Sequence, residues 1–367
     1  MRAGTNAQFD KARAQQPLGF VADNTHQADY NSTVNSWVEQ RLFVTQAPAL
    51  LEQVYPALAK NLSAALDLLA HPVVPTPEGM KAVVSPVGAA LQCGAWTVKL
   101  GSSGAMTSLV RKDKPSVDWA SESKPIGEFR YQTFTSGDFN VFLKDFGSRI
   151  GDKGVWPEHT PGHYADFNYS TSDMQCGNFC KKNMSSARPT HRELTPTMSS
   201  AWHSGNVGGC KILTKAMLPQ DVRVEAGAPA EVVVEVTIEG STLDWAVVMV
   251  DKRPTRLAES VFFSFDPAVA EPEGWTLQVL GSQMDPTDTL GKLGETEADS
   301  IYGGSPHLRG VEAARWKGVA GAFTLTSLDV PVLCTGKASP FVTPRTQPPD
   351  MSQGVHWNVF QNIWNTK

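Results

Sequence analysis

The chain has 367 residues, 41% of them hydrophobic and 19% charged, with a formal net charge of −5. This ordinary globular mixture excludes a disordered or collagen-like chain, and the acidic surplus argues against nucleic acid as a partner. No run of eighteen apolar residues predicts a membrane span, and 30 glycines with 25 prolines predict many turns and mostly β structure.

The N-terminal part is expected to hold a lead-in and a short helical segment. Residues 1–35 are polar and irregular, without the apolar stretch of a signal peptide, so the default expectation is a cytoplasmic location. From 36 to 72, apolar residues recur at three- and four-residue steps, which is typical of a helix. Pro48 is expected in the first turn of a second helix, and Pro56 is expected to kink or restart it.

Residues 80–366 are expected to form a β region. Short hydrophobic runs alternate with turns rich in Gly and Pro, a pattern that favours a large antiparallel β-sandwich. The predicted strands are Ala82–Val84, Ala95–Leu100, Met106–Val110, 127–135, Val222–Val224, Ala230–Ile238, Leu243–Asp251, Ser260–Phe265, Thr276–Leu280, Phe323–Leu328 and Val355–Ile363.

A segment rich in Cys, His, Gly and Ser, at about 150–209, interrupts the strand pattern. It predicts a long loop or an insertion folded around something, because structureless loops of this length are rare in compact domains. Thiolates and imidazoles are zinc ligands, but their spacing here matches no standard zinc motif. No metal is therefore predicted, and the weak candidates are Cys176, Cys180, His191, His203 and Cys210.

The five cysteines favour reduced thiols, because an odd number in a long chain is not typical of a disulfide framework. The alternative is a disulfide between Cys176 and either Cys180 or Cys210. Motifs of nucleophilic, phosphate-binding and zinc-hydrolase chemistry are lacking: there is no Gly-x-Ser-x-Gly, no Walker loop and no His-Glu-x-x-His. The sequence assigns no catalytic residue.

The last predicted strand carries aromatic side chains on both of its faces. Strand alternation puts Val355, Trp357 and Val359 on one face, and His356, Asn358 and Phe360 on the other. One face is expected in the core. The other either packs as well or lines a cleft, where aromatic rings suit stacking against sugars.

Five stretches in fixed order resemble a known family. They are Ser36–Arg41, Gly104–Val110, Gly127–Phe134, Arg256–Phe265 and Gly354–Thr366. Together they are similar to the C-terminal half of a family defined by a domain of unknown function (DUF5054), over residues 36–366. That family is similar in turn to the family 38 α-mannosidases among the glycoside hydrolases.

The resemblance implies an architecture. Family 38-like enzymes have a catalytic (β/α) barrel with a zinc ion, then a helical bundle, then a large super-sandwich similar to that of galactose mutarotase. The chain would begin at the end of the bundle and continue through the sandwich. No segment matches the barrel, its zinc motif or its nucleophile, so the zinc would belong to a missing barrel and this chain is expected to carry no cofactor.

The resulting functional hypothesis is a partial chain: a non-catalytic, carbohydrate-associated β-sandwich region of a family 38-like glycoside hydrolase. Its expected partners are carbohydrate or a catalytic barrel domain. The alternatives are an independent hydrolase with a site in the 150–210 insertion, or a structural β-domain that binds a partner chain. Candidate residues for the sugar cleft or the domain interface are Arg130, Tyr131, Arg256, Glu259, His356 and Trp357.

Overall fold

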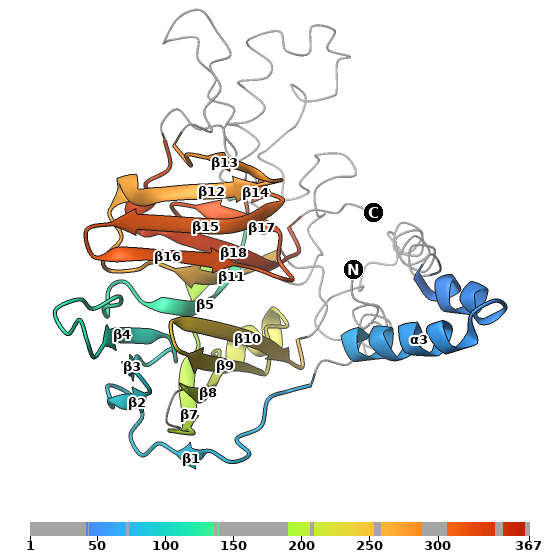
Figure 1. The fold of residues 1–367 in the computed structure, drawn as a ribbon, viewed down its shortest axis with the longest axis horizontal. Helices are drawn as coiled ribbons and strands as arrows, with labels where there is room; N and C mark the ends of the chain where they lie inside the picture. The colour runs from blue at the N-terminus through green and yellow to red at the C-terminus, as the bar shows by residue number, and fades with distance from the viewer. Residues whose placement is uncertain are drawn as a thin grey trace, which may run out of the picture.

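Antiparallel strand pairs dominate the fold and form three sheets (Figure 1). The computed structural model describes residues 42, 44–70, 73–135, 138, 190–205, 209–252, 258–287, 307–341 and 348–363. The expected class, a mainly β protein with a short helical segment, is confirmed.

The largest sheet has nine strands in the order β14-β17-β18-β11-β5-β4-β3-β2, with β6 also paired to β5. Every residue of β11 is buried, as expected for a central strand covered on both faces. The strands are β2 (Leu91–Cys93), β3 (Trp96–Leu100), β4 (Met106–Arg111), β5 (Ile126–Thr133), β6 (Arg192–Leu194), β11 (Glu259–Phe265), β14 (His307–Arg309), β17 (Val332–Thr335) and β18 (Val355–Gln361).

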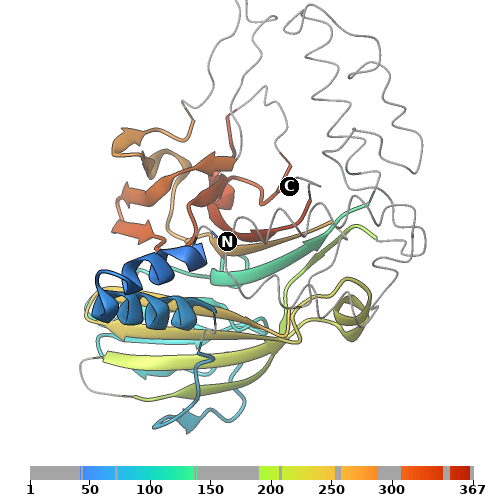
Figure 2. The same cartoon turned by 90° about the vertical axis from the view of Figure 1, so that its right-hand side faces the viewer.

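Two smaller sheets complete the β region. The five-stranded sheet runs β1 (Lys81–Ala82), β7 (Thr197–His203), β8 (Gly209–Met217), β9 (Glu231–Glu239) and β10 (Thr242–Val250). The four-stranded sheet runs β13 (Ser282–Met284), β12 (Trp275–Val279), β15 (Val311–Gly318) and β16 (Gly321–Thr326). In both views β5 lies between these two sheets (Figures 1 and 2).

A shared hydrophobic core joins the three sheets. From the five-stranded sheet, the Trp245 ring meets Phe265 of β11 edge to face, with centroids 5.3 Å apart. From the four-stranded sheet, Trp316 meets Trp119 in the same geometry at 6.3 Å, and Trp119 lies in the segment that joins β4 to β5 of the nine-stranded sheet. The arrangement is therefore a sandwich in which both small sheets pack on the large one.

Gly127 lies where β5 comes close to a side chain of the five-stranded sheet. Its φ is +73°, and a Cβ at this position would lie 2.8 Å from the Trp245 indole nitrogen. Any other residue would be strained there and would have to displace the Trp245 ring, so both the backbone and the packing favour glycine.

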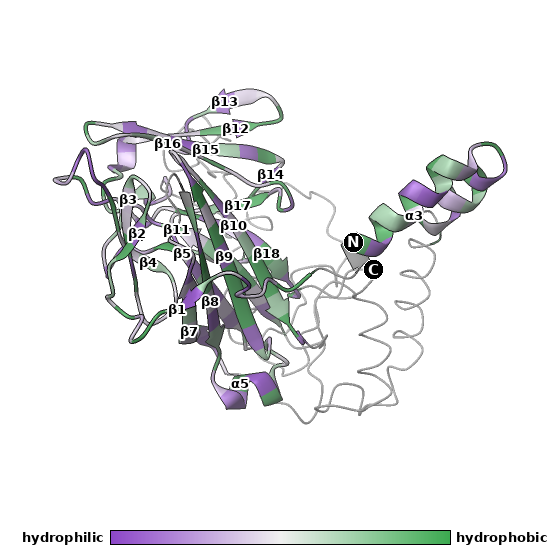
Figure 3. Ribbon diagram, turned by 60° about the horizontal axis from the view of Figure 1, so that its bottom comes forward, coloured by the Kyte–Doolittle hydropathy of each residue, from purple (hydrophilic) through white to green (hydrophobic). Residues whose placement is uncertain are grey.

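The helical segment stands apart from the sheets (Figures 1 and 3). It consists of a helical stretch over 44–52 and of α3 (Pro56–Ala70). Pro56 is the first residue of α3, so the predicted restart is confirmed, whereas Pro48 lies inside the preceding helix. None of the helices within the described residues is long and apolar enough to cross a membrane.

Two predictions about local structure need correction. The run Val222–Val224 was expected as a strand but lies in a short helix, α5 (Gln220–Glu225), which packs Val222 into the core. The later part of the predicted insertion is regular, because 192–203 contains β6 and β7; its earlier part, 150–189, and residues 206–208 lie outside the described residues. The described residues also contain two single-turn helices, η2 (Pro272–Gly274) and η4 (Met351–Gln353).

The expectation of reduced thiols is wrong for two cysteines. Cys93 on β2 and Cys210 on β8 form a disulfide across 117 residues of sequence, which joins the nine-stranded sheet to the five-stranded sheet. The number of cysteines gives no information on which of them meet in space. Cys93 is also distant in sequence from the other cysteines that were considered for a disulfide. Cys334 is a buried thiol outside this bond.

Candidate functional site

The central strands β5, β11 and β18 carry five of the six predicted cleft residues, and strand alternation divides them between two faces. Tyr131, Glu259 and Trp357 point into the core between the sheets, whereas Arg130 and His356 lie on the opposite face. The sixth, Arg256, lies outside the described residues. The candidates therefore do not form one site.

On the core face, Tyr131 and Glu259 meet directly. Both side chains are completely buried, and the Tyr131 hydroxyl donates a short hydrogen bond to Glu259 Oε2. Lys252, which follows β10, donates to the other carboxylate oxygen, with Nζ 2.7 Å from Oε1. We call these three residues the ionic cluster.

A β-bulge completes the surroundings of the ionic cluster. The pairing of β18 with β11 shifts between Val261 and Phe262, so Val359 is an extra residue in β18. The shift turns Phe360 to the core face, away from the His356 face on which alternation alone placed it. Its ring centroid lies 5.1 Å from the Lys252 ammonium, in cation–π geometry.

Burial determines what the ionic cluster can do chemically. Burial raises the pKa of Tyr131 well above its ordinary value, and the adjacent Glu259 carboxylate raises it further. The phenol therefore stays protonated and acts as a hydrogen-bond donor, not as a base. Since Tyr131 and Glu259 are fully buried, the ionic cluster positions strands and does not contact a solute in this conformation.

On the opposite face, His356 is held as a neutral imidazole. Burial, together with the positive charge of Arg130, lowers its pKa to about 3. The Nε2 atom lies 2.6 Å from the Gly336 carbonyl oxygen, which can only accept, so Nε2 donates; Nδ1 then accepts from the Ser264 hydroxyl at 2.9 Å. This fixes the tautomer and leaves no ring nitrogen for an incoming group.

Other polar side chains of this face are also engaged. Arg130 Nε donates to Glu128 Oε2 at 2.8 Å, and Asn358 Nδ2 donates to the Ser260 hydroxyl oxygen at 2.9 Å. Gln132 Nε2 donates to the Ala338 carbonyl oxygen at 3.0 Å. Arg130 is the most accessible of the five described cleft candidates, with a third of its side chain exposed.

The weak metal candidates within the described residues lie in two places. His191 Nδ1 lies 3.0 Å from Asp138 Oδ1, while His203 ends β7 beside the Cys93–Cys210 disulfide. Cys176 and Cys180 lie outside the described residues. The structure therefore brings together only His203 and Cys210 of the described candidates, and adds Cys93, which sequence reasoning missed.

Lys252 is the second residue that the sequence did not point to. It lies just after a predicted strand, where a lysine is ordinarily solvated, and its contact with Glu259 depends on how β10 and β11 pack. One signal in the sequence could have pointed to Lys252. The hydrophobic run Glu259–Phe265 begins with a carboxylate, and a carboxylate buried in a central strand needs a charged partner.

Comparison with known proteins supports the expected membership of the DUF5054 family. No curated protein matches the chain. The family model described as "Domain of unknown function (DUF5054)" matches residues 4–243, starting earlier than the expected 36 and ending before 366. The relation to the family 38 α-mannosidases stays a prediction. Because the match covers more than half of the chain, the protein belongs to the DUF5054 family.

Proposed function

We propose that this chain is a non-catalytic, carbohydrate-associated β-sandwich region that supports a glycoside hydrolase domain similar to the family 38 α-mannosidases. Its task is to hold a catalytic (β/α) barrel through the helical segment and to contribute a wall to the sugar cleft. The barrel, not this chain, supplies the catalytic carboxylates and the metal.

The observation that carries this proposal is the apolar surface of the helical segment. Large hydrophobic side chains that would be buried in a helical bundle are more than half exposed to solvent. We call them the helical surface, and they are Leu50, Val54, Tyr55, Leu58 and Leu68. Figure 3 shows the segment projecting from the β-sandwich, with apolar residues along it.

An exposed cluster of this kind favours a protein partner. Leu50 lies in the helical stretch over 44–52, Val54 in the turn that follows it and Leu58 in α3, so both helices and the turn between them carry exposed apolar side chains. Scattered single hydrophobic residues are normal at a surface, but a contiguous group marks an interaction site. In the architecture that the resemblance implies, a helical bundle lies between barrel and sandwich, so a barrel domain is the partner that fits.

The state of the polar residues favours a supporting role over an active site. Glu259 and Tyr131 are buried and hydrogen-bonded to each other within the ionic cluster, and both ring nitrogens of His356 already make hydrogen bonds. Arg130 has a partly exposed side chain beside Glu128, and its guanidinium suits a hydrogen bond to a sugar hydroxyl or to a neighbouring domain. It is our candidate for the cleft wall.

The cytoplasmic location remains a prediction, and the Cys93–Cys210 bond bears on it. Stable disulfides are typical of oxidising compartments, so the bond favours maturation outside a reducing cytoplasm. Alkylation of the protein directly on lysis, followed by mass spectrometry of the peptides with Cys93 and Cys210, distinguishes a cytoplasmic protein from one in an oxidising compartment. Free thiols at both positions support the cytoplasm, and a linked pair supports an oxidising compartment.

The proposal is tested by assaying the purified chain against aryl α-mannosides and other aryl glycosides, with the zinc content measured on the same sample. We expect a folded protein without turnover. Turnover that survives repurification and increases with added zinc would overturn the proposal. It would favour the alternative of an independent hydrolase with its site in the 150–210 insertion.

A further inference from the structure

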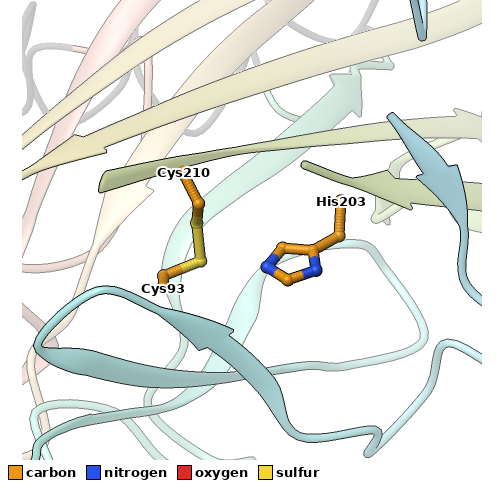
Figure 4. Close-up of side chains that lie close together, drawn as sticks. All are labelled: Cys93, His203 and Cys210. Carbon is orange, nitrogen blue, oxygen red and sulfur yellow. A yellow bond between two sulfur atoms is a disulfide. The ribbon is translucent and has the colours of Figure 1, made fainter. Parts of the chain in front are cut away.

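A second cluster of reactive side chains lies at the edge where the five-stranded and nine-stranded sheets are joined. Figure 4 shows Cys93, Cys210 and His203 side by side, and their sulfur and ring nitrogen atoms all lie within 4.8 Å of one another. They come from three strands: β2, the start of β8 and the end of β7. The fold therefore brings the three ligand atoms together from separate parts of the chain.

A disulfide that only links two strands does not require a neighbouring imidazole, yet His203 lies beside this one. His203 is held at this place by the β7–β8 hairpin, where it pairs with Ile212, and its Nε2 lies 3.0 Å from the carbonyl oxygen of Gln92, next to Cys93. Two sulfur atoms and one imidazole are the donor set of known zinc sites.

We propose that Cys93, Cys210 and His203 form a redox-controlled cation site, which binds a divalent cation of the zinc class when the disulfide is reduced. The two thiolates and one imidazole nitrogen supply three ligands. Both cysteines are buried, whereas His203 is partly exposed, so water can reach the side of the histidine and supply the fourth ligand.

The exchange between the two states balances with a dithiol as reductant. The dithiol gives two electrons and two protons, the Cys93–Cys210 bond breaks into two thiols, and the reductant becomes a disulfide. The cation then displaces the two thiol protons into solvent as it binds. Oxidation by a disulfide of the same class reverses these steps and releases the cation.

The backbone geometry suits both states. The Cα atoms of Cys93 and Cys210 lie 5.1 Å apart. With zinc–sulfur bonds of about 2.3 Å, two thiolates of a tetrahedral site lie roughly 3.8 Å from each other. Side-chain rotation at the two cysteines can provide this separation without moving β2 or β8.

Cobalt(II) is the probe that tests the proposal, because its thiolate complexes absorb in the near ultraviolet and visible range. The full-length chain is used with Cys176→Ser and Cys180→Ser, which removes the two other cysteines of the insertion. We expect about one cobalt per chain after reduction by a phosphine and none before it. In the same background, Cys210→Ser should abolish the thiolate band, and His203→Ala should weaken binding at least tenfold. His191→Ala is the matched control and should bind like its parent.

Three results would overturn the proposal. The first is a reduced chain with native circular dichroism that binds no cobalt. The second is cobalt binding that His203→Ala leaves unchanged. The third is a chain that unfolds on reduction and does not regain its native spectrum with zinc, because a cation bound in the folded state must stabilise that state. None of these results depends on a carbohydrate role for the protein.

Discussion

Lys252 and Glu259 form an ion pair inside the β-sandwich, and single substitutions there should be costly. Glu259→Gln removes the carboxylate that faces the Lys252 ammonium and the Tyr131 hydroxyl. Breaking a buried pair of this kind typically lowers the free energy of unfolding by about 3–5 kcal/mol. Guanidinium denaturation of the variant and the parent measures this loss.

Two controls distinguish a buried ion pair from a general effect of charge. Lys211→Met removes the lysine of a more exposed pair, Lys211–Glu235, and should cost less than about 1 kcal/mol. The double variant Lys252→Met with Glu259→Leu should regain much of the stability that the single variants lose. A Glu259→Gln protein as stable as the parent would contradict the role assigned to the ionic cluster.

His356 gives the stability of the protein a defined dependence on pH. Its pKa in the folded state is about 3, below its ordinary 6.5, so the unfolded chain binds the proton more readily. The stabilisation is present above pH 6.5 and is lost as the pH falls toward 3, at up to about 1.4 kcal/mol per pH unit. His356→Gln should flatten this slope in urea unfolding series between pH 7 and 4. An identical slope in the variant would show that other groups cause the dependence.

Individual site residues could be predicted from the sequence only in part. Tyr131 and Glu259 were selected from stretches that resemble a family, and the structure pairs them. The face of Phe360 could not be predicted, because one extra residue in β18 reverses the alternation, and nothing in the run Val355–Gln361 marks the bulge. Cys93 was missed because its partner lies 117 residues away in sequence. Lys252 was missed because its contact with Glu259, only seven residues later, depends on how β10 and β11 pack.

At the scale of elements, the link between β2 and β8 should contribute measurably to stability. The Cys93–Cys210 bond closes a loop of more than a hundred residues and so restricts the unfolded chain. The double variant Cys93→Ala with Cys210→Ala should have a free energy of unfolding about 2–4 kcal/mol lower than that of the oxidised parent. The reduced parent without added metal should approach the variant. A variant as stable as the oxidised parent would show that the bond is dispensable.

Secondary structure was predictable where hydrophobic periodicity was strong. β9, β10 and β11 match the predicted runs within about one residue at each end. The prediction failed at Val222–Val224 for a local reason. Two β-branched valines favoured a strand, but the run follows Pro219 in the short helix α5, which buries only Val222. β15 was missed because its sequence, VEAARWKG, is short of large hydrophobic residues.

At the scale of the whole molecule, composition and turn frequency were enough to predict a mainly β protein, and the recurrence of apolar residues over 36–72 predicted the helical N-terminal segment. The division into three sheets was not predictable, because strand order depends on contacts such as Trp245 with Phe265 that join distant segments. The exposed helical surface is the feature of the whole molecule that most directly predicts a partner.

The measurement that tests this central claim compares α-mannosidase activity co-purified from the native source with tagged full-length chains. The test variant carries Leu50→Ser, Val54→Ser and Leu58→Ser on the helical surface. The control carries Leu280→Ser, Val319→Ser and Leu328→Ser, which replace equally large and still more exposed side chains elsewhere. We predict that the parent and the control recover the activity and that the test variant loses at least nine tenths of it. Equal recovery by all three proteins, or none with any of them, would contradict a catalytic domain held by the helical surface.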